Sequence, residues 1–223
     1  MTSTAANVEV GGRRLGLTNL NKILYPAHGF TKGELIDYYA RIAPVLLPHV
    51  KDRPASFQRF PNGVDATGFF AKNAPAGTPE WVRTVRLPAP GSSKDRDEID
   101  YVMVDDLPGL VWLANLAAIE LHVPQWKTGP RGKVHGSDLL VFDLDPGAPA
   151  SISECCEVAL RLREELARDG LESYAKTSGS KGMQLYAPIR PVGGEATSRP
   201  WQPTNPTNPL AGKPTEPSLD APH

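Results

Sequence analysis

The sequence predicts a mixed α/β fold, an α+β arrangement in which helices pack on a mixed sheet. Short apolar or alternating runs bounded by turn residues recur along the chain and are typical of strands. Two longer segments with helical spacing begin at residues 31–34 and 151–154, each with the Thr/Ser-x-x-Glu pattern of a capping box. The apolar run at residues 139–144 predicts a fully buried strand, around which we expect the sheet to be organised.

The expected elements follow one another with turn signals between them. Residues 8–17 alternate loosely around Gly11-Gly12 and predict a hairpin. The helix that begins at Thr31 contains Pro44 and Pro48, which we expect to kink or end it. Further strands are expected at residues 54–60, 82–87, 99–104 and 183–189, and further helices from Asp106 through Ile119 and from Ser151 to Gly170.

Composition and charge narrow the class of protein. The 223 residues include 24 Lys and Arg against 25 Asp and Glu, so the net charge gives no indication of nucleic-acid binding. Basic residues nevertheless outnumber acidic ones between residues 13 and 59, which fits either a phosphate-binding surface or a solvated face. The two cysteines, Cys155 and Cys156, are adjacent and predict neither a disulfide framework nor a metal site. Without a secretory signal or a bilayer-length apolar run, the chain is expected to be cytoplasmic, with no membrane partner.

The chain is expected to hold one domain with unstructured ends. Residues 1–7 are small and polar, and residues 199–223 are rich in proline with little apolar surface. Both segments are therefore predicted to be disordered, and the domain is expected over residues 8–198.

Two carboxylates mark the end of the central predicted strand. Asp143 and Asp145 are separated by one residue, so on a strand they project from the same face with Cα atoms roughly 6.5–7 Å apart. Carboxylates this close repel each other, and a divalent cation between them removes the repulsion. Mg²⁺ and Mn²⁺ favour such oxygen ligands. The alternative is that Asp145 simply begins an ordinary Asp-Pro-Gly turn.

Three further segments carry side chains suited to nucleotides or nucleic acids, each with a structural alternative. Phe69 and Phe70 cannot both enter a core from an extended segment, so one is expected to pack and the other to be available for stacking on a base. A loop packed on its own side chains is the alternative. His122 lies in an apolar setting and is either a hydrogen-bonded structural residue or a ligand contact. Residues 177–182 combine hydroxyls, glycines and a lysine that suit a triphosphate, although glycine-serine turns are common.

Seven short motifs occur in an order that resembles the polymerase domain of bacterial DNA ligase D, within the archaeo-eukaryotic primase superfamily. The resemblance covers residues 8–198 and implies a mixed α/β primase-polymerase-like domain built around the strand that carries Asp143. The motifs lie at residues 18–26, 53–55, 61–65, 69–72, 120–126, 141–147 and 177–182.

The resemblance implies roles for particular residues. Asp143 and Asp145 match metal-binding catalytic aspartates, with Mn²⁺ or Mg²⁺ as the cofactor. The positions that match nucleotide-binding residues are His122, Ser178, Lys181 and Gln184. The positions that match DNA-binding residues are Lys22 and Lys32 for the 5′-phosphate at a gap and Phe69 and Phe70 for a DNA-contacting loop.

The activity implied by the resemblance is template-directed addition of nucleotides, preferably ribonucleotides, to a 3′-hydroxyl at DNA ends or gaps in non-homologous end joining. The implied partners are DNA ends or gapped duplexes with a 5′-phosphate, together with nucleoside triphosphates. Ku and a separate DNA ligase are further candidate partners. The implied location is the nucleoid in a bacterial cytoplasm.

The sequence departs from the family pattern at three places. Gln184 stands where the second motif normally has histidine, and Gln58 stands where end-joining members often have lysine. A third carboxylate is expected on a strand beyond the second motif, but the chain turns to prolines near Arg199. We therefore expect a domain that is incomplete at its C-terminus, through a frameshift or a premature end.

These departures leave two other hypotheses open. The first is a catalytically weak or inactive remnant that still binds 5′-phosphorylated DNA ends. The second is a phosphatase-like hydrolase with Asp143 as nucleophile, which the Pro146-Gly147 pair after the second aspartate disfavours.

Overall fold

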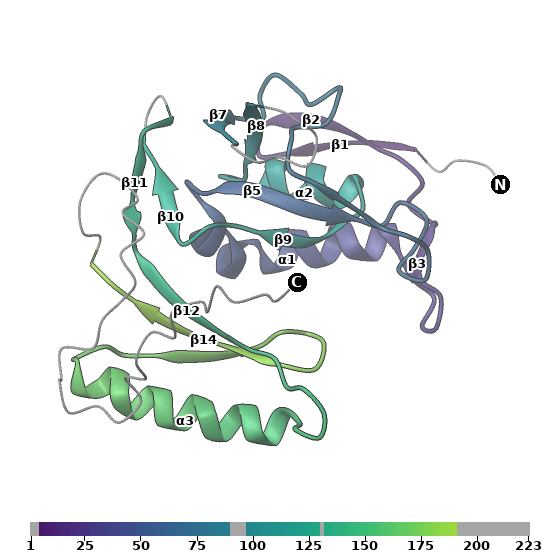
Figure 1. The fold of residues 1–223 in the computed structure, drawn as a ribbon. Coiled ribbons are helices and arrows are strands. Elements are labelled where there is room, and N and C mark those ends of the chain that lie inside the picture. The colour runs from purple at the N-terminus through teal and green to yellow at the C-terminus, as the bar shows by residue number, and fades with distance from the viewer. Residues whose placement is uncertain (1–4, 90–96, 130–131, 191–223) are drawn as a thin grey trace, which may run out of the picture. The chain divides into compact units, whose positions relative to one another are not determined.

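The computed structural model describes residues 5–89, 97–129 and 132–190, which form two compact units (Figure 1). Of the described residues, unit 1 comprises those up to Leu139 together with Arg190, and unit 2 comprises residues 140–189. None of the helices in the described ranges is long and apolar enough to cross a membrane. Residues 1–4 and the expected tail at 199–223 lie outside these ranges.

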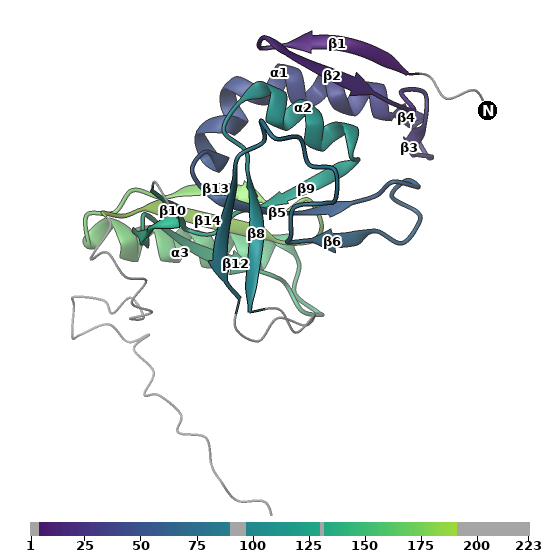
Figure 2. The same ribbon diagram turned by 90° about the horizontal axis from the view of Figure 1, so that it is seen from above.

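Unit 1 is built on an antiparallel sheet with strand order β6-β5-β8-β7, to which β9 is added beside β5. Helices α1 and α2 pack on each other, and the β1–β2 hairpin contacts α2 (Figure 2). The elements are β1 (Ala6–Val10), β2 (Arg13–Leu17), β3 (Ile23–Tyr25), β4 (Phe30–Thr31), α1 (Lys32–Val50), β5 (Pro54–Arg59), β6 (Phe69–Ala71), β7 (Thr84–Pro88), β8 (Glu98–Met103), α2 (Leu107–Asn115), β9 (Ala118–His122), β10 (Trp126–Thr128) and β11 (Val134–Ser137).

The core of unit 1 lies between the sheet and the two helices. Phe57 on β5 and Leu110 and Leu113 on α2 are completely buried and belong to one apolar cluster. The predicted hairpin is confirmed, with Val10 opposite Arg13 and both turn glycines at positive φ. A two-residue turn of this kind matches the twist of the flanking strands.

Pro44 and Pro48 were expected to kink or end the first helix, and the second of these outcomes is wrong. Helix α1 begins at the predicted capping box, where the N–H of Glu34 donates to Thr31 Oγ1, and it continues to Val50. Pro44 and Pro48 are four residues apart and both exposed, so they share one solvent-facing side of the helix. The carbonyl groups left without a backbone donor by the two prolines are therefore on the side where water can reach them.

The expectation that the second helix would continue through Ile119 is also wrong. Asp106 caps α2 as predicted, but the helix ends at Asn115 and Ala117 takes a positive φ of 54°. The following residues pair with β5 as strand β9, and the hydroxyl of Tyr39 donates to the carbonyl oxygens of Ala118 (2.8 Å) and Ile119 (3.1 Å). Pairing with β5 therefore overrides the apolar, helix-compatible sequence.

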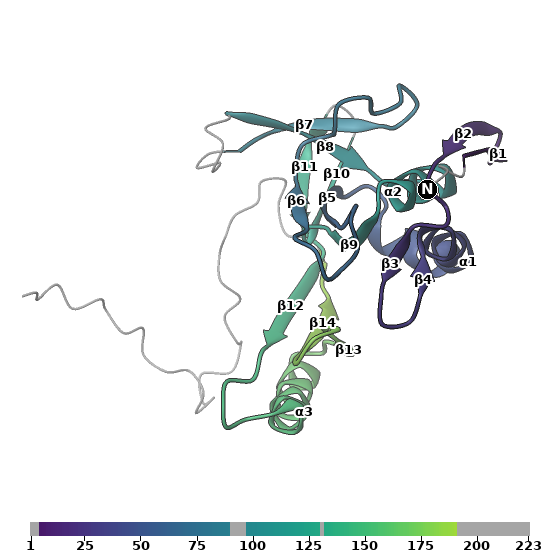
Figure 3. The ribbon, with the colours of Figure 1, turned by 90° about the vertical axis from the view of Figure 1, so that its right-hand side faces the viewer.

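Unit 2 is a three-stranded sheet covered on one face by a helix (Figure 3). Its elements are β12 (Leu139–Leu144), α3 (Ile152–Arg168), β13 (Tyr174–Thr177) and β14 (Met183–Pro188), and the strand order is β12-β14-β13. The capping box predicted at the start of α3 is present, with the Ser151 N–H donating to Glu154 Oε2 at 2.6 Å.

The expectation of a fully buried strand at residues 139–144 is wrong. β12 lies at the edge of the sheet, and its residues are partly buried except for Asp143, which is exposed. The central strand is β14, because β12 and the β13 arm of the following hairpin pair with its two edges. An edge strand covered by a helix on one face cannot reach the burial that a continuous apolar run predicts.

The contact between Tyr39 and the start of β9 gives a test of the fold. Tyr39→Phe leaves the buried carbonyl of Ala118 and the partly buried carbonyl of Ile119 without this donor, and we expect it to lower the free energy of unfolding by about 1–2 kcal/mol in urea denaturation. Tyr38→Phe, on the exposed neighbouring residue, is the control and should change it by less than about 0.5 kcal/mol. Equal values for the two variants would contradict the assigned role of the hydroxyl.

Candidate functional site

The two predicted metal-binding carboxylates lie on the face of the unit 2 sheet that is turned away from α3. Leu140, Phe142 and Leu144 pack with the apolar clusters beneath α3, so side-chain alternation turns Asp143 to the opposite face. Asp145 follows two positions later, and both carboxylates are exposed. Because β12 ends at Leu144, its packing sets the face of Asp143, and the shared face of Asp143 and Asp145 stays a prediction.

The predicted phosphate loop at residues 178–182 closes against the end of β12. The backbone N–H of Ser178 donates to the carbonyl of Gly182 (3.0 Å), and the Gly182 N–H donates to Ser178 Oγ (3.2 Å). A Cβ atom at position 182 would clash with the backbone carbonyl oxygen of Leu144 and would lie 2.6 Å from Asp145 Oδ1, so only glycine lets the loop approach the end of β12 this closely. Ser178 thus closes the loop, while Gly182 sets the loop beside Asp145.

A depression of about 770 Å³ lies between this loop and the start of α3. Lys181 is the one charged residue among those that line it, and Ser151 and Ile152 contribute the first residues of the helix. Backbone N–H groups at a helix start and a lysine ammonium both favour anions. The depression therefore has the chemistry of a phosphate site, although Glu154 already occupies part of the helix start.

The donor set on β12 fits a hard divalent cation. Within the described residues, no group of three or more His, Cys, Asp or Glu side chains is placed to hold a metal ion. Two carboxylates are nevertheless sufficient for Mg²⁺ or Mn²⁺ when substrate phosphates complete the coordination. The ion pairs of the described chain include neither Asp143 nor Asp145, so both carboxylates remain available.

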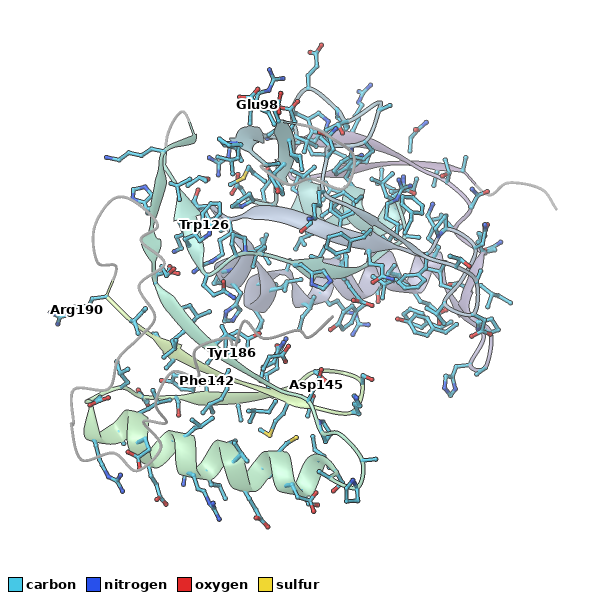
Figure 4. All side chains as sticks on the ribbon, viewed as in Figure 1. Glu98, Trp126, Phe142, Asp145, Tyr186 and Arg190 are labelled. Atoms are coloured by element: carbon cyan, nitrogen blue, oxygen red, sulfur yellow. The ribbon has the colours of Figure 1, made fainter. Side chains whose placement is uncertain are left out.

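Gln184 lies beside the first of these carboxylates. Its side-chain Nε2 donates to Asp143 Oδ1 at 3.3 Å, and its Oε1 accepts from the hydroxyl of Tyr186 at 2.6 Å. Figure 4 shows Phe142 and Tyr186, which extend to opposite faces of the same sheet. Tyr186 is a neighbour of the site that the sequence analysis missed, because only the pairing of β12 with β14 connects it to Asp143.

Unit 1 contains a separate cluster of cations that includes both predicted DNA-binding lysines. Lys32 is only 5% exposed, and its backbone N–H donates to the carbonyl of Lys22 (2.8 Å). The partners of the two ammonium groups are neutral oxygens, Thr18 Oγ1 for Lys32 and Asn62 Oδ1 for Lys22. None of the ion pairs in the described residues involves either lysine.

Burial and neighbouring positive charges disfavour the protonated form of Lys32 and lower its pKa. Burial, followed by the positive charges of Lys22 and Arg59, lowers the pKa of Lys32 to about 8. The sequence analysis did not single out Arg59, whose position at the end of β5, just before the Pro61-Asn62-Gly63 turn, was the available signal. Three cations beside neutral acceptors form a site that an anion would stabilise.

The aromatic pair predicted to contact DNA lies on β6. Phe69 and Phe70 are 46% and 45% exposed, so the expectation that one of them packs in the core is wrong. β6 is an edge strand that pairs with β5, and each ring instead has one polar neighbour. The Arg59 guanidinium lies 5.0 Å from the centroid of the Phe69 ring, and the Phe70 ring meets His122 edge-on at 5.2 Å.

His122 is half exposed at the end of β9 and is not a core histidine. Its Nε2 lies 3.3 Å from Glu120 Oε2, and it borders a depression of about 510 Å³ that Tyr101 and Trp126 also line. An exposed imidazole beside aromatic walls can contact a ligand. The contact with Glu120 fits a hydrogen-bonded structural residue, and the ligand contact stays a prediction.

The predicted site residues fall into two groups, one in each unit. Unit 1 holds Lys22, Lys32, Phe69, Phe70 and His122. Unit 2 holds Asp143, Asp145, Ser178, Lys181 and Gln184.

Comparison with known proteins identifies the family of this chain. A family model described as the LigD primase-polymerase domain matches residues 31–202. The chain belongs to this family. The primase-polymerase resemblance and the mixed α/β fold predicted from the sequence are thereby confirmed.

The chain is similar to part of several bacterial LigD proteins. A multifunctional non-homologous end joining protein LigD of Mycobacterium bovis is 40% identical over 188 residues, which cover 79% of this chain and 23% of the relative. A bifunctional non-homologous end joining protein LigD of Bacillus subtilis is 33% identical over 178 residues, which cover 80% of this chain and 27% of that relative. The chain thus spans about a quarter of the length of the curated relatives it matches.

A solved structure shares the fold. The polymerase domain from Mycobacterium tuberculosis ligase D, solved in complex with DNA, matches with a TM-score of 0.74 and 42% sequence identity. The match covers 80% of this chain and 63% of that chain.

The buried ammonium of Lys32 gives a stability test with a defined pH dependence. The folded pKa of about 8 lies below the value of an exposed lysine, so folding penalises the charged form at neutral pH. We expect Lys32→Met to raise the free energy of unfolding at pH 7 by about 1–2 kcal/mol, after allowance for solvent screening. The advantage should shrink between about pH 8 and 10.5, where folded Lys32 has already lost the proton that the unfolded chain retains.

The control for this test is Lys51→Met, which removes an exposed lysine that follows α1. Urea denaturation at pH 7 and at pH 10 gives both free energies. A Lys32→Met variant that is less stable than the parent at pH 7 would contradict the cost assigned to the buried charge.

Proposed function

We propose that this chain is a template-dependent nucleotidyltransferase that extends a 3′-hydroxyl at DNA ends or gaps, with a preference for ribonucleotides. The observation that carries the proposal is the position of Asp143 on β12 and of Asp145 just after its last residue, with the loop that contains Lys181 closed against Asp145. Carboxylates beside a phosphate-binding loop are the parts that phosphoryl transfer requires. The family assignment and the names of the relatives support the same class of reaction.

In this reaction, the residues of unit 2 would have separate roles in binding the metal ion and the phosphates. Asp143 and Asp145 would hold Mg²⁺ or Mn²⁺, which when bound activates the attacking oxygen and stabilises the departing pyrophosphate. Lys181 would neutralise phosphate charge from the neighbouring depression, and Ser178 would keep the loop closed. The 3′-hydroxyl would attack the α-phosphate, forming the new P–O bond as the bond to pyrophosphate breaks.

The cations of unit 1 would bind the 5′-phosphate that borders a gap. Lys22 and Lys32 face neutral oxygens, so a phosphate would supply the negative charge that the free protein lacks there. The exposed rings of Phe69 and Phe70 would stack on bases near that end, and His122 would contact the nucleotide. This binding supports a place in non-homologous end joining, which the names of the relatives also indicate.

Partners and location follow from this proposed substrate. Strand sealing needs a ligation step that the residues described above do not supply, so a DNA ligase and the end-binding protein Ku are proposed partners. The bacterial nucleoid is the proposed location, because DNA ends are the substrate.

A second candidate function is end binding without polymerisation. It is favoured by the division of the predicted residues, because the cation cluster lies entirely in unit 1 while both carboxylates lie in unit 2. Binding can therefore be retained when catalysis is weak.

The two functions are separated by an extension assay on a gapped duplex with a 5′-phosphate, ribonucleotides and Mn²⁺. Asp143→Ala removes one of two carboxylates and should lower extension by at least about 100-fold, since metal stabilisation of the transition state is worth several kcal/mol. Glu157→Ala, on the exposed part of α3, is the control and should leave extension unchanged. Extension that persists in Asp143→Ala would contradict the proposed active site, and binding without extension by the parent would favour the second function.

The 5′-phosphate site is tested by comparing duplexes with a 5′-phosphate and with a 5′-hydroxyl. The double variant Lys22→Met/Lys32→Met should lose at least about 100-fold in affinity for the phosphorylated duplex, since two hydrogen bonds to charged groups together contribute about 3–6 kcal/mol. The parent's preference for the phosphate should weaken as pH rises through about 8, where free Lys32 loses its proton. Lys51→Met is the control, and fluorescence anisotropy gives the affinities. A double variant that still prefers the phosphorylated duplex would overturn the site.

A further inference from the structure

We propose that Gln184 and Tyr186 are positioning residues that orient Asp143 for its metal ion. The inference rests on the proposed function, because it takes Asp143 to be a metal ligand. It adds two hydrogen bonds, Gln184 to Asp143 (3.3 Å) and Tyr186 to Gln184 (2.6 Å), to the parts of the site that the family pattern predicts.

Strand pairing places Asp143, Gln184 and Tyr186 on one face of the unit 2 sheet. On β14, Met183, Leu185 and Ala187 are buried on the side of α3, so Gln184 and Tyr186 face the other way. β12 pairs with β14 and presents Asp143 on that same face.

A fourth residue, on the other edge strand of the sheet, contacts Tyr186. Lys176 on β13 lies opposite Gln184, and its Nζ is 5.6 Å from the centroid of the Tyr186 ring. A cation above an aromatic face is attracted by the ring, which holds the Tyr186 ring in place.

The chemistry of the three groups fixes the direction of both hydrogen bonds. An ionised carboxylate only accepts hydrogen bonds, so the amide nitrogen of Gln184 must face Asp143. The amide oxygen then faces Tyr186, whose hydroxyl must donate to it. Tyr186 therefore selects the amide orientation in which Gln184 can donate to Asp143.

This arrangement restrains Asp143 without neutralising it. The amide occupies Oδ1 and limits rotation of the carboxylate, while Oδ2 remains available for a cation. A lysine or arginine at the same position would form an ion pair that competes with the metal, whereas a neutral amide does not. Partners that hydrogen-bond a metal ligand orient it and typically affect metal affinity by about 10–100-fold. The second N–H of the amide remains free to contact a nucleotide phosphate, so the two roles of Gln184 are compatible.

The inference is tested by titrating the full chain with Mn²⁺ alone and following free Mn²⁺ by electron paramagnetic resonance. Tyr186→Phe removes the hydroxyl that holds the amide, and we expect it to lower Mn²⁺ affinity by about 10-fold. Tyr174→Phe is the matched control, because Tyr174 lies opposite Tyr186 on β13 and its hydroxyl interacts with Glu172 instead. The control should bind Mn²⁺ within about 2-fold of the parent.

A second pair of variants keeps the test independent of folding defects in the first. Gln184→Leu removes both hydrogen bonds and should also lower Mn²⁺ affinity by about 10-fold. Gln184→His offers one ring nitrogen to donate to Asp143 and another to accept from Tyr186, so it should bind Mn²⁺ like the parent. A role in packing alone would not predict this rescue. Thermal unfolding of each variant verifies that the fold is retained.

Failure of the inference can be distinguished from failure of the proposed function. Mn²⁺ binding that is lost in Asp143→Ala but unchanged in both Tyr186→Phe and Gln184→Leu would overturn the orienting role and leave the metal site intact. Absence of Mn²⁺ binding by the parent, or binding that survives Asp143→Ala, would overturn both.

Discussion

The alternation of side chains along a β-strand determines which chemical groups unit 2 presents. Leu185 on β14 and Leu144 on β12 pack toward α3, so their neighbours Gln184 and Asp143 must face the opposite side. A slip of one residue in either strand would turn a polar group into the apolar cluster and expose a leucine. The helix on one face of the sheet therefore fixes the location of the carboxylates on the other face.

Both groups of predicted site residues contain charges whose arrangement is unfavourable in the free protein. Lys32 is buried near two other cations, and its partner is the neutral Thr18 hydroxyl. Asp143 near the end of β12 and Asp145 just after it have no ion-pair partner among the described residues. A phosphate would relieve the first arrangement and a divalent cation the second. Local conflicts of this kind are expected where a protein binds a ligand of opposite charge, and this is the physical basis of the proposed function.

Local signals in the sequence predicted where helices begin better than where they end. The capping boxes at Thr31 and Ser151 and the cap at Asp106 are formed within four residues of chain, and all three are confirmed. The end of α2 could not be read locally, because Leu116 to Ile119 remain apolar and only pairing with β5 turns them into a loop and a strand. The continuation of α1 through Pro44 likewise depends on which side of the helix meets solvent.

The sequence by itself determined that Asp143 and Asp145 come at the end of a strand and that Gly182 ends a lysine-bearing loop, because these properties follow from patterns within one short segment. It also determined the family, through motifs whose order is independent of their folding. Only the tertiary structure decided that β14 is the central strand of unit 2, that Gln184 donates to Asp143 and accepts from Tyr186, and that Arg59 acts on Lys32. Those contacts join segments separated by tens of residues, and strand pairing and burial, rather than local backbone geometry, select them.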